Sequence, residues 1–137
     1  MNKIILLVFC TLAISCSTSE TNISSLNEQE RWNHRAENTE IIRDDFGIPH
    51  IYGKTDADAV FGMLYAQCED DFNRVERNYI WAIGRLAEVE GEKALYSDLR
   101  ANLYMTKEEA IINYEKSPKW LQELCVAFAD GINFYLK

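Results

Sequence analysis

The sequence predicts an α+β protein in which a β-hairpin is followed by a mainly helical array. Two short apolar runs, residues 41–42 and 48–52, flank a polar turn that closes at Gly47. Runs rich in β-branched and aromatic residues on either side of Asp and Gly are typical of a hairpin. From Thr55 onward, apolar residues recur every three or four positions, which is the spacing of an amphipathic helix. The change of period after the hairpin therefore defines the fold class.

Length and composition limit the classes of protein to which the chain can belong. Its 137 residues allow one domain, and a hydrophobic content of 47% with 7 Tyr, 6 Phe and 3 Trp is sufficient for a globular core. The formal net charge is −8. A nucleic-acid partner is therefore not expected, because binding to phosphates needs clusters of Lys and Arg.

The N-terminus has the composition of an export signal. Lys3 precedes an apolar run, residues 4–14, that is too short for a stable transmembrane helix. Residues 1–15 resemble a bacterial lipoprotein signal, after which Cys16 would carry the lipid. An ordinary signal peptide with Cys16 incidental is the alternative. In either case the mature protein is expected to be exported, and a lipid on Cys16 would anchor it to a bacterial membrane, on the periplasmic or the outer-membrane side.

The segment between this signal and the hairpin is strongly polar. Residues 16–38 are predicted to form a tether. The charged residues around Trp32 leave open either a short helical turn or an irregular lead-in, and His34 is interpreted as a solvated polar residue. The folded domain is then expected to cover residues 39–137.

Cysteine and histidine spacing gives no metal site. Cys68 and Cys125 both lie in predicted helices, where a disulfide in an exported protein and two unpaired buried thiols are both possible. The sequence contains no Cys-x-x-Cys pair, and His34 and His50 have no partner at metal-ligand spacing. A zinc site is therefore not expected.

The first long helix is predicted to begin after Thr55, which can cap it. Gly62 lies inside the helix, and a glycine costs about 1 kcal/mol relative to Ala at such a position. We therefore expect a neighbouring element to approach the helix backbone closely at Gly62. The helical pattern continues until Gly84, which is expected to break or kink the helix.

Three consecutive acids, residues 69–71, interrupt the apolar pattern of this helix. They suggest either a cation site or acid–base chemistry, but consecutive helical side chains point about 100° apart and cannot converge on one ion. We favour a structural role in which one acid, Asp70, turns inward while the others face solvent. Its expected partners are Arg74, Arg77 or Arg85.

The remaining elements follow from caps and breakers. Gly91 ends a short turn, and the pattern over residues 93–105 is irregular. Thr106 with Glu109 forms a capping box for the next helix, and Pro118 begins the last one. One face of that helix is expected to carry Trp120, Leu121, Leu124, Cys125, Phe128 and Ala129.

Large apolar residues continue to the end of the sequence. Ile132, Phe134, Tyr135 and Leu136 are expected to need partners from further chain, so the sequence is interpreted as a piece of a longer protein. The alternative is a last helix that docks on its own domain.

Several motifs occur together in an order that resembles the penicillin acylase family. They are Ile42-Arg43-Asp44, Gly47-Ile48-Pro49-His50-Ile51, Tyr65-Ala66-Gln67 with Asp70, Gly84-Arg85-Leu86-Ala87-Glu88 with Gly91, and Phe128-Ala129-Asp130-Gly131-Ile132-Asn133. The family consists of N-terminal-nucleophile amide hydrolases and includes acyl-homoserine-lactone acylases. The resemblance implies an αββα-type enzyme of which this sequence is the first part of the α subunit. The run Cys68-Glu69-Asp70-Asp71 resembles the acyl-homoserine-lactone acylases more than the penicillin G acylases.

The resemblance implies a mechanism whose chemical groups lie elsewhere. Family members are precursors that cleave themselves before a Ser, and the α-amine of that Ser then acts as the base for attack on an amide carbonyl. That Ser and the oxyanion donors would lie beyond Lys137, in a β-subunit portion that is the expected partner. The complete enzyme would act on an amide small molecule and possess a calcium site, whereas no cofactor is expected in this chain.

No residue of this sequence is therefore assigned to catalysis, and the chain alone is expected to be inactive. His50 is interpreted as a hydrogen-bonding core residue. A non-catalytic, lipid-anchored binding or structural module with an acylase-derived scaffold is the alternative function. The positions that match the family are interpreted as scaffold: Arg43, Asp44, Gly47, Pro49, His50, Asp70, Arg85, Glu88 and Gly131.

Overall fold

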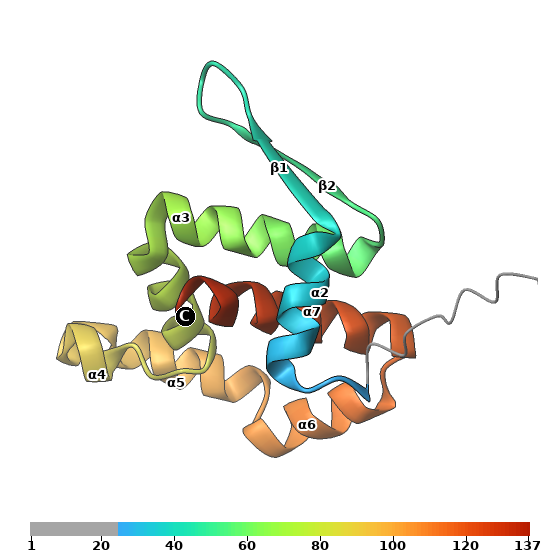
Figure 1. Cartoon of the computed structure of the whole chain (residues 1–137). Helices are drawn as coiled ribbons and strands as arrows, with labels where there is room; N and C mark the ends of the chain where they lie inside the picture. The colour runs from blue at the N-terminus through green and yellow to red at the C-terminus, as the bar shows by residue number, and fades with distance from the viewer. Residues whose placement is uncertain (1–24) are drawn as a thin grey trace, which may run out of the picture.

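Residues 25–137 are described by a computed structural model, which contains one two-stranded hairpin among helices. Figure 1 shows the hairpin projecting from a body built of helices, which confirms the predicted α+β class. Among the described residues, no helix has the length and apolar character needed to cross a bilayer. The elements are α2 (Glu28–Glu37), β1 (Thr39–Arg43), β2 (Pro49–Gly53), α3 (Asp56–Ala82), α4 (Ala87–Glu90), the 3-10 helix η2 (Glu92–Ala94), α5 (Leu95–Tyr104), α6 (Lys107–Lys116) and α7 (Lys119–Tyr135).

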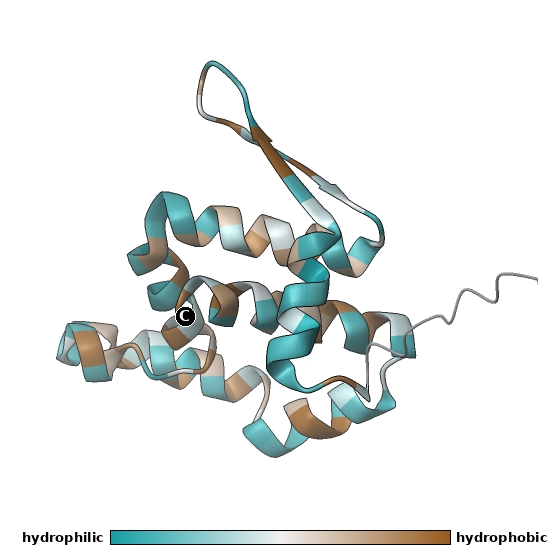
Figure 2. Cartoon of the chain, in the orientation of Figure 1, coloured by the Kyte–Doolittle hydropathy of each residue, from teal (hydrophilic) through white to brown (hydrophobic). Residues whose placement is uncertain are grey.

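The hairpin forms where the sequence predicted it. Its strands are antiparallel, with Ile41 opposite Ile51, and Gly47 adopts the positive φ of 80° that the turn requires. Figure 2 shows hydrophobic segments along both strands. A Cβ on Gly62 of α3 would lie 2.5 Å from Thr39 and 2.9 Å from Ile51. The expected close approach at Gly62 is therefore confirmed, and the neighbouring element is the hairpin.

Helix α3 begins and ends as predicted but is not continuous. The Thr55 hydroxyl oxygen accepts the backbone N–H of Asp58, and the Asp58 side chain accepts from Thr55 in return. Asp71 departs from helical geometry (φ −161°, ψ 79°) and kinks the helix. Its carboxylate accepts the Arg74 N–H at 3.1 Å, which caps the second half. Gly84, with φ 67°, follows the end of the helix.

The core lies between α3 and α7. Phe61 of α3 packs with Ala127 of α7, and both are buried. The ring centroid of Phe134 lies 5.4 Å from that of Phe61, and that of Tyr135 lies 5.5 Å from that of Phe72. These aromatic residues at the end of α7 therefore find partners within the chain, contrary to the expectation that further chain was needed for both.

The buried face of α7 differs from the predicted one. Trp120 remains 62% exposed and Phe128 41% exposed, whereas Ala127, Asp130 and Gly131 are buried. A Cβ on Gly131 would lie 2.5 Å from the Phe61 carbonyl oxygen. Small residues thus face α3 where the two helix backbones approach closely, and Trp120 and Phe128 lie outside that contact.

Two segments are more regular than the sequence suggested. Residues 28–37, within the expected tether, form α2, which begins with a complete capping box between Asn27 and Glu30. Residues 93–105 were expected to be irregular, but they contain α5. The buried Asp98 side chain on α5 accepts the N–H groups of Leu86 and Ala87 at 2.8 and 2.7 Å, and this polar contact attaches α5 to the start of α4.

Candidate functional site

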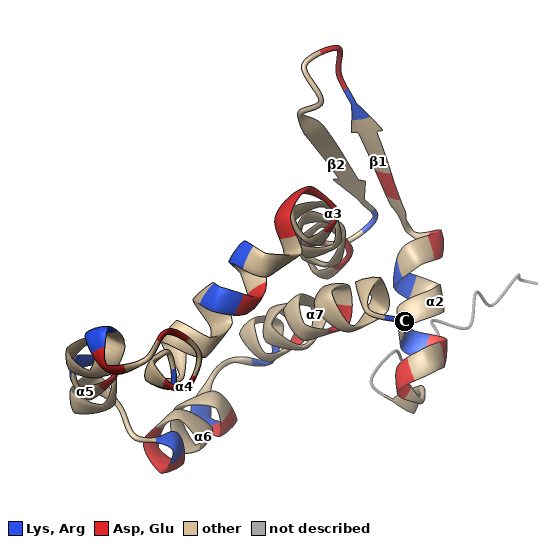
Figure 3. Cartoon of the chain, turned by 90° about the vertical axis from the view of Figure 1, so that its left-hand side faces the viewer, with Lys and Arg blue, Asp and Glu red and all other residues tan. Residues whose placement is uncertain are grey.

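A buried cluster of charged residues joins the first and last helices of the described region. Asp130 of α7 is only 2% exposed. Both of its carboxylate oxygens accept from Arg31 of α2 at 2.7 Å. The Trp32 indole N–H donates to the same carboxylate at 2.8 Å, and Arg35 Nε donates at 3.2 Å. Figure 3 shows α2 beside α7, a helix with few charged residues. Asp130 is the charged residue of α7 to which α2 is attached.

The cluster extends to α3 through Arg35. Nη1 of Arg35 lies 3.5 Å from Oδ1 of Asp58, and both side chains are almost fully buried. Neither atom has a hydrogen-bond partner among the described residues. The other oxygen of Asp58 accepts from the Thr55 hydroxyl at 2.8 Å. One ionic network therefore connects α2, α3 and α7.

The electrostatics of the network stabilise the ionised form of Asp130. Burial by itself would raise the pKa of this carboxyl, because a charge is poorly solvated in the interior. Hydrogen bonds from Arg31 and Trp32, with the charges of Arg31 and Arg35, outweigh that effect and lower the pKa of Asp130 below its usual value. The hydrogen bond to Asp130 correspondingly raises the pKa of Arg31.

A second polar group forms the turn of the hairpin. Oδ1 of Asp44 accepts the N–H groups of Phe46 and Ile48 at 2.9 Å, and Oδ2 lies 3.3 Å from Nε2 of His50. The Ile48 hydrogen bond is the largest cause that lowers the pKa of Asp44, with His50 and Phe46 adding to it. His50 is hydrogen-bonded as expected, but its side chain is 52% exposed. Its interpretation as a core residue was wrong, because it lies on the hairpin surface that faces away from α3.

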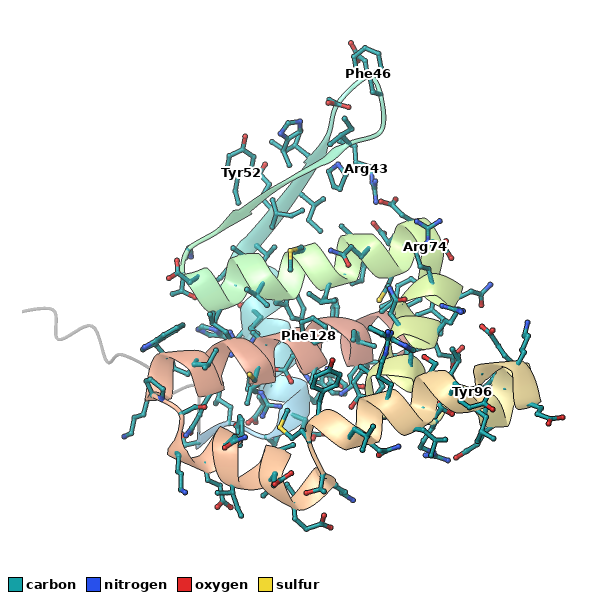
Figure 4. All side chains as sticks on the ribbon, turned by 180° about the vertical axis from the view of Figure 1, so that it is seen from behind. Arg43, Phe46, Tyr52, Arg74, Tyr96 and Phe128 are labelled. Carbon is teal, nitrogen blue, oxygen red and sulfur yellow. The ribbon has the colours of Figure 1, made fainter. Side chains whose placement is uncertain are left out.

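Arg43 connects this turn to the acidic run of α3. Its guanidinium donates to the Gly47 carbonyl at 2.9 Å, lies 2.9 Å from Asp70 and donates to Glu69 at 3.2 Å. Hydrogen bonding to Glu69 is the largest cause that raises the pKa of Arg43. Figure 4 shows the Arg43 side chain extending from the hairpin toward α3.

The expected inward orientation of Asp70 was therefore wrong. Its side chain is 53% exposed and its partner is Arg43 of the hairpin, rather than an Arg of its own helix. Asp71 pairs with Arg74 instead. The kink at Asp71 explains the difference, because regular helical spacing no longer relates the acids to the arginines that follow.

The other predicted scaffold residues are dispersed. Pro49 pairs opposite Arg43 in the hairpin. Arg85 and Glu88 form an exposed ion pair at the start of α4, and Gly131 lies in the contact between α3 and α7. The structure thus brings Arg43, Asp44, Gly47, Pro49, His50 and Asp70 together around the hairpin and leaves Arg85, Glu88 and Gly131 apart.

The two cysteines of the described region are free thiols. Cys68 is buried, and desolvation raises its pKa, while Cys125 is exposed. Neither the disulfide nor a pair of buried thiols is found. Cys16, the expected lipidation site, lies outside the described residues.

Sequence reasoning did not identify the network around Asp130. A signal was present, since Arg31 and Arg35 are one helical turn apart with Trp32 beside them, and Asp130 is an acid within an apolar helix. Nothing in the sequence, however, indicated that Arg31 pairs with Asp130, which lies 99 positions further along the chain.

The polar contacts described above hold the helices and the hairpin in place. Over residues 25–137, no group of three His, Cys, Asp or Glu side chains could hold a metal ion. Thr55 and Thr106 each donate a hydroxyl hydrogen bond to a carboxylate, but both act as helix caps.

The family model described as penicillin amidase matches residues 38–137. The chain belongs to the penicillin amidase family. The match begins next to the hairpin and includes every predicted scaffold residue.

Relatives with assigned names are consistent with that membership. The chain is 33% identical over 101 residues to acyl-homoserine lactone acylase QuiP of Pseudomonas aeruginosa, covering 74% of this chain. It is 26% identical over 96 residues to penicillin acylase 2 proenzyme of a Pseudomonas species, covering 70% of this chain. The chain spans only 12% of the length of these relatives.

A solved structure supports the fold. A thermostable penicillin G acylase from Alcaligenes faecalis superimposes with a TM-score of 0.64 at 22% sequence identity. The alignment covers 72% of this chain and 52% of that chain. The hairpin-and-helix arrangement is therefore a fragment of the penicillin acylase fold.

Proposed function

We propose that this chain is the N-terminal scaffold of an amide hydrolase that removes the acyl group from a penicillin or an acyl-homoserine lactone. The observation that carries the proposal is the family match over residues 38–137. The names of the relatives supply the two substrate types. The partner in this proposal is the remainder of the same precursor.

In this proposal the residues of the chain position other groups and do not react. The Arg43 contacts fix the hairpin to α3, and the Asp130 network fixes α2 and α3 to α7. A rigid support of this kind suits an enzyme whose hydroxyl nucleophile and amine base must be held in contact. The nucleophilic Ser, its oxyanion donors and any calcium ligands would come from the partner portion.

The test is to translate the DNA that follows the codon for Lys137 and to express the longer product. Its extracts are assayed by chromatography for hydrolysis of an acyl-homoserine lactone and of penicillin G. We expect one of the two substrates to be cleaved by the longer product and neither by residues 1–137 alone. Turnover by the short chain, or a downstream sequence with no further part of the family, would refute the proposal.

We also propose that the protein is exported and carries a lipid on Cys16, with the membrane as a further partner. The support is the apolar run of residues 4–14 and the small residues before Cys16. In cells fed radioactive palmitate, the wild-type chain should be labelled and Cys16→Ser should not. Cys10→Ser is the matched control and should retain the label. Labelling of Cys16→Ser would exclude the anchor.

A further inference from the structure

A groove of about 860 Å³ lies between the end of α3, helix α5 and the start of α6. Its walls carry large apolar side chains that the helical body leaves exposed. The Trp81 indole N–H donates to the Ser97 hydroxyl at 2.8 Å, which fixes one wall of the groove. The other large apolar lining residues are Tyr79, Ile83, Tyr104 and Met105.

The charge of the groove is opposite to that of the chain. Arg85, Arg100 and Lys107 line it and no Asp or Glu does, although the chain as a whole carries a formal charge of −8. Arg85 is neutralised by Glu88. Within residues 25–137, neither Arg100 nor Lys107 forms an ion pair. Two cations without counterions therefore border an apolar surface.

We infer that the groove binds an anionic amphiphile, a small molecule with one apolar tail and a carboxylate head. The tail would lie along the aromatic wall and the carboxylate would pair with Arg100 and Lys107. The volume falls within the roughly 300–1,000 Å³ of small-molecule sites. The inference does not depend on the proposed hydrolase activity.

The three tryptophans provide a direct test. The full chain, labelled with 5-fluorotryptophan and held in phosphatidylcholine nanodiscs, is titrated with octanoate while its ¹⁹F spectrum is recorded. We expect the Trp81 resonance to shift saturably, because Trp81 alone of the three lines the groove. The Trp32 and Trp120 resonances should not shift. Octanol serves as the uncharged probe and should bind at least about five times more weakly.

Matched variants separate the groove cations from general charge. Arg100→Gln combined with Lys107→Gln should weaken octanoate binding about fivefold, since two exposed ion pairs are lost. Lys116→Gln combined with Lys119→Gln removes two positive charges outside the groove and should leave binding unchanged. The inference is overturned if Trp81 does not respond, if octanol binds as tightly as octanoate, or if both double variants weaken binding equally.

Discussion

Replacement of Asp130 by Asn is the most informative perturbation of the scaffold. Asp130→Asn keeps the size of the side chain but removes the charge that Arg31 and Arg35 require. Arg35 is 4% exposed and Arg31 17% exposed at the side chain, so water can only partly replace the lost carboxylate. The expected result is a large loss of stability with little change in the shape of the folded state.

The size of the effect follows from the contacts. Asp130 accepts four hydrogen bonds, and bonds to a charged group are worth about 1.5–3 kcal/mol each. The contributions are not additive, and Asn retains one acceptor oxygen. Removing one partner of a buried ion pair costs about 3–5 kcal/mol. Because Arg31 is partly hydrated, we expect the lower end, about 3 kcal/mol.

The assay is urea unfolding followed by tryptophan fluorescence and by circular dichroism. Asp45→Asn is the control, since Asp45 is exposed on the hairpin and should change stability by less than about 0.5 kcal/mol. If Asp130→Asn does not fold, Trp32→Phe removes a single donor to the charged carboxylate and should cost about 1.5–3 kcal/mol. A loss below about 1 kcal/mol for Asp130→Asn would show that the network does not hold α2 in place.

The same variant gives a pH test. The pKa of Asp130 is lowered in the folded state, so its stabilising contribution is present above the unfolded value of about 3.9. That contribution is lost as the pH falls through the folded value. The stability difference between wild type and Asp130→Asn should therefore be constant near neutrality and shrink only below about pH 4. A difference that declines between pH 7 and pH 5 would point to another group.

Three further predictions concern separate elements. Gly131→Ala should destabilise the fold by about 1–3 kcal/mol, because its Cβ would lie 2.5 Å from the Phe61 carbonyl oxygen; unchanged urea unfolding would contradict that contact. Asp44→Ala should speed hydrogen exchange at the backbone N–H groups of Phe46 and Ile48, which donate to Asp44, and leave the helical amides unaffected. In native protein, a thiol reagent should modify the exposed Cys125 rapidly and the buried Cys68 only on unfolding; equal rates would show that Cys68 is accessible.

Features that depend on a few neighbouring residues were predictable from the sequence. The cap at Thr55, the capping box at Thr106 and the turn at Gly47 appear where expected, because their hydrogen bonds join residues within four positions of one another. The hairpin was predictable for the same reason. Gly62 was informative because a glycine inside a helix costs about 1 kcal/mol relative to Ala, which favours a closely packed neighbour as the reason for it.

Features that depend on long-range contacts were not predictable. The partner of Asp70 was misassigned because the expectation assumed a continuous helix, whereas the kink at Asp71 directs Glu69 and Asp70 toward Arg43. Helix α2 could not be decided from the sequence, which left a short helical turn or an irregular lead-in open, because its own apolar content is low. It packs through Arg31 and Arg35, and no local pattern shows that these residues meet Asp130.

The separation of 99 positions between Arg31 and Asp130 also has a consequence for synthesis of the chain. At about 5–20 residues per second, the ribosome needs roughly 5–20 s after making Arg31 to produce the acid that pairs with it. During that interval α2 has no ionic partner on α7, and Phe61 has no α7 to cover it. The helical body must therefore assemble after most of the chain has emerged. Until then the nascent chain exposes apolar surface, and chaperones would bind this incomplete form.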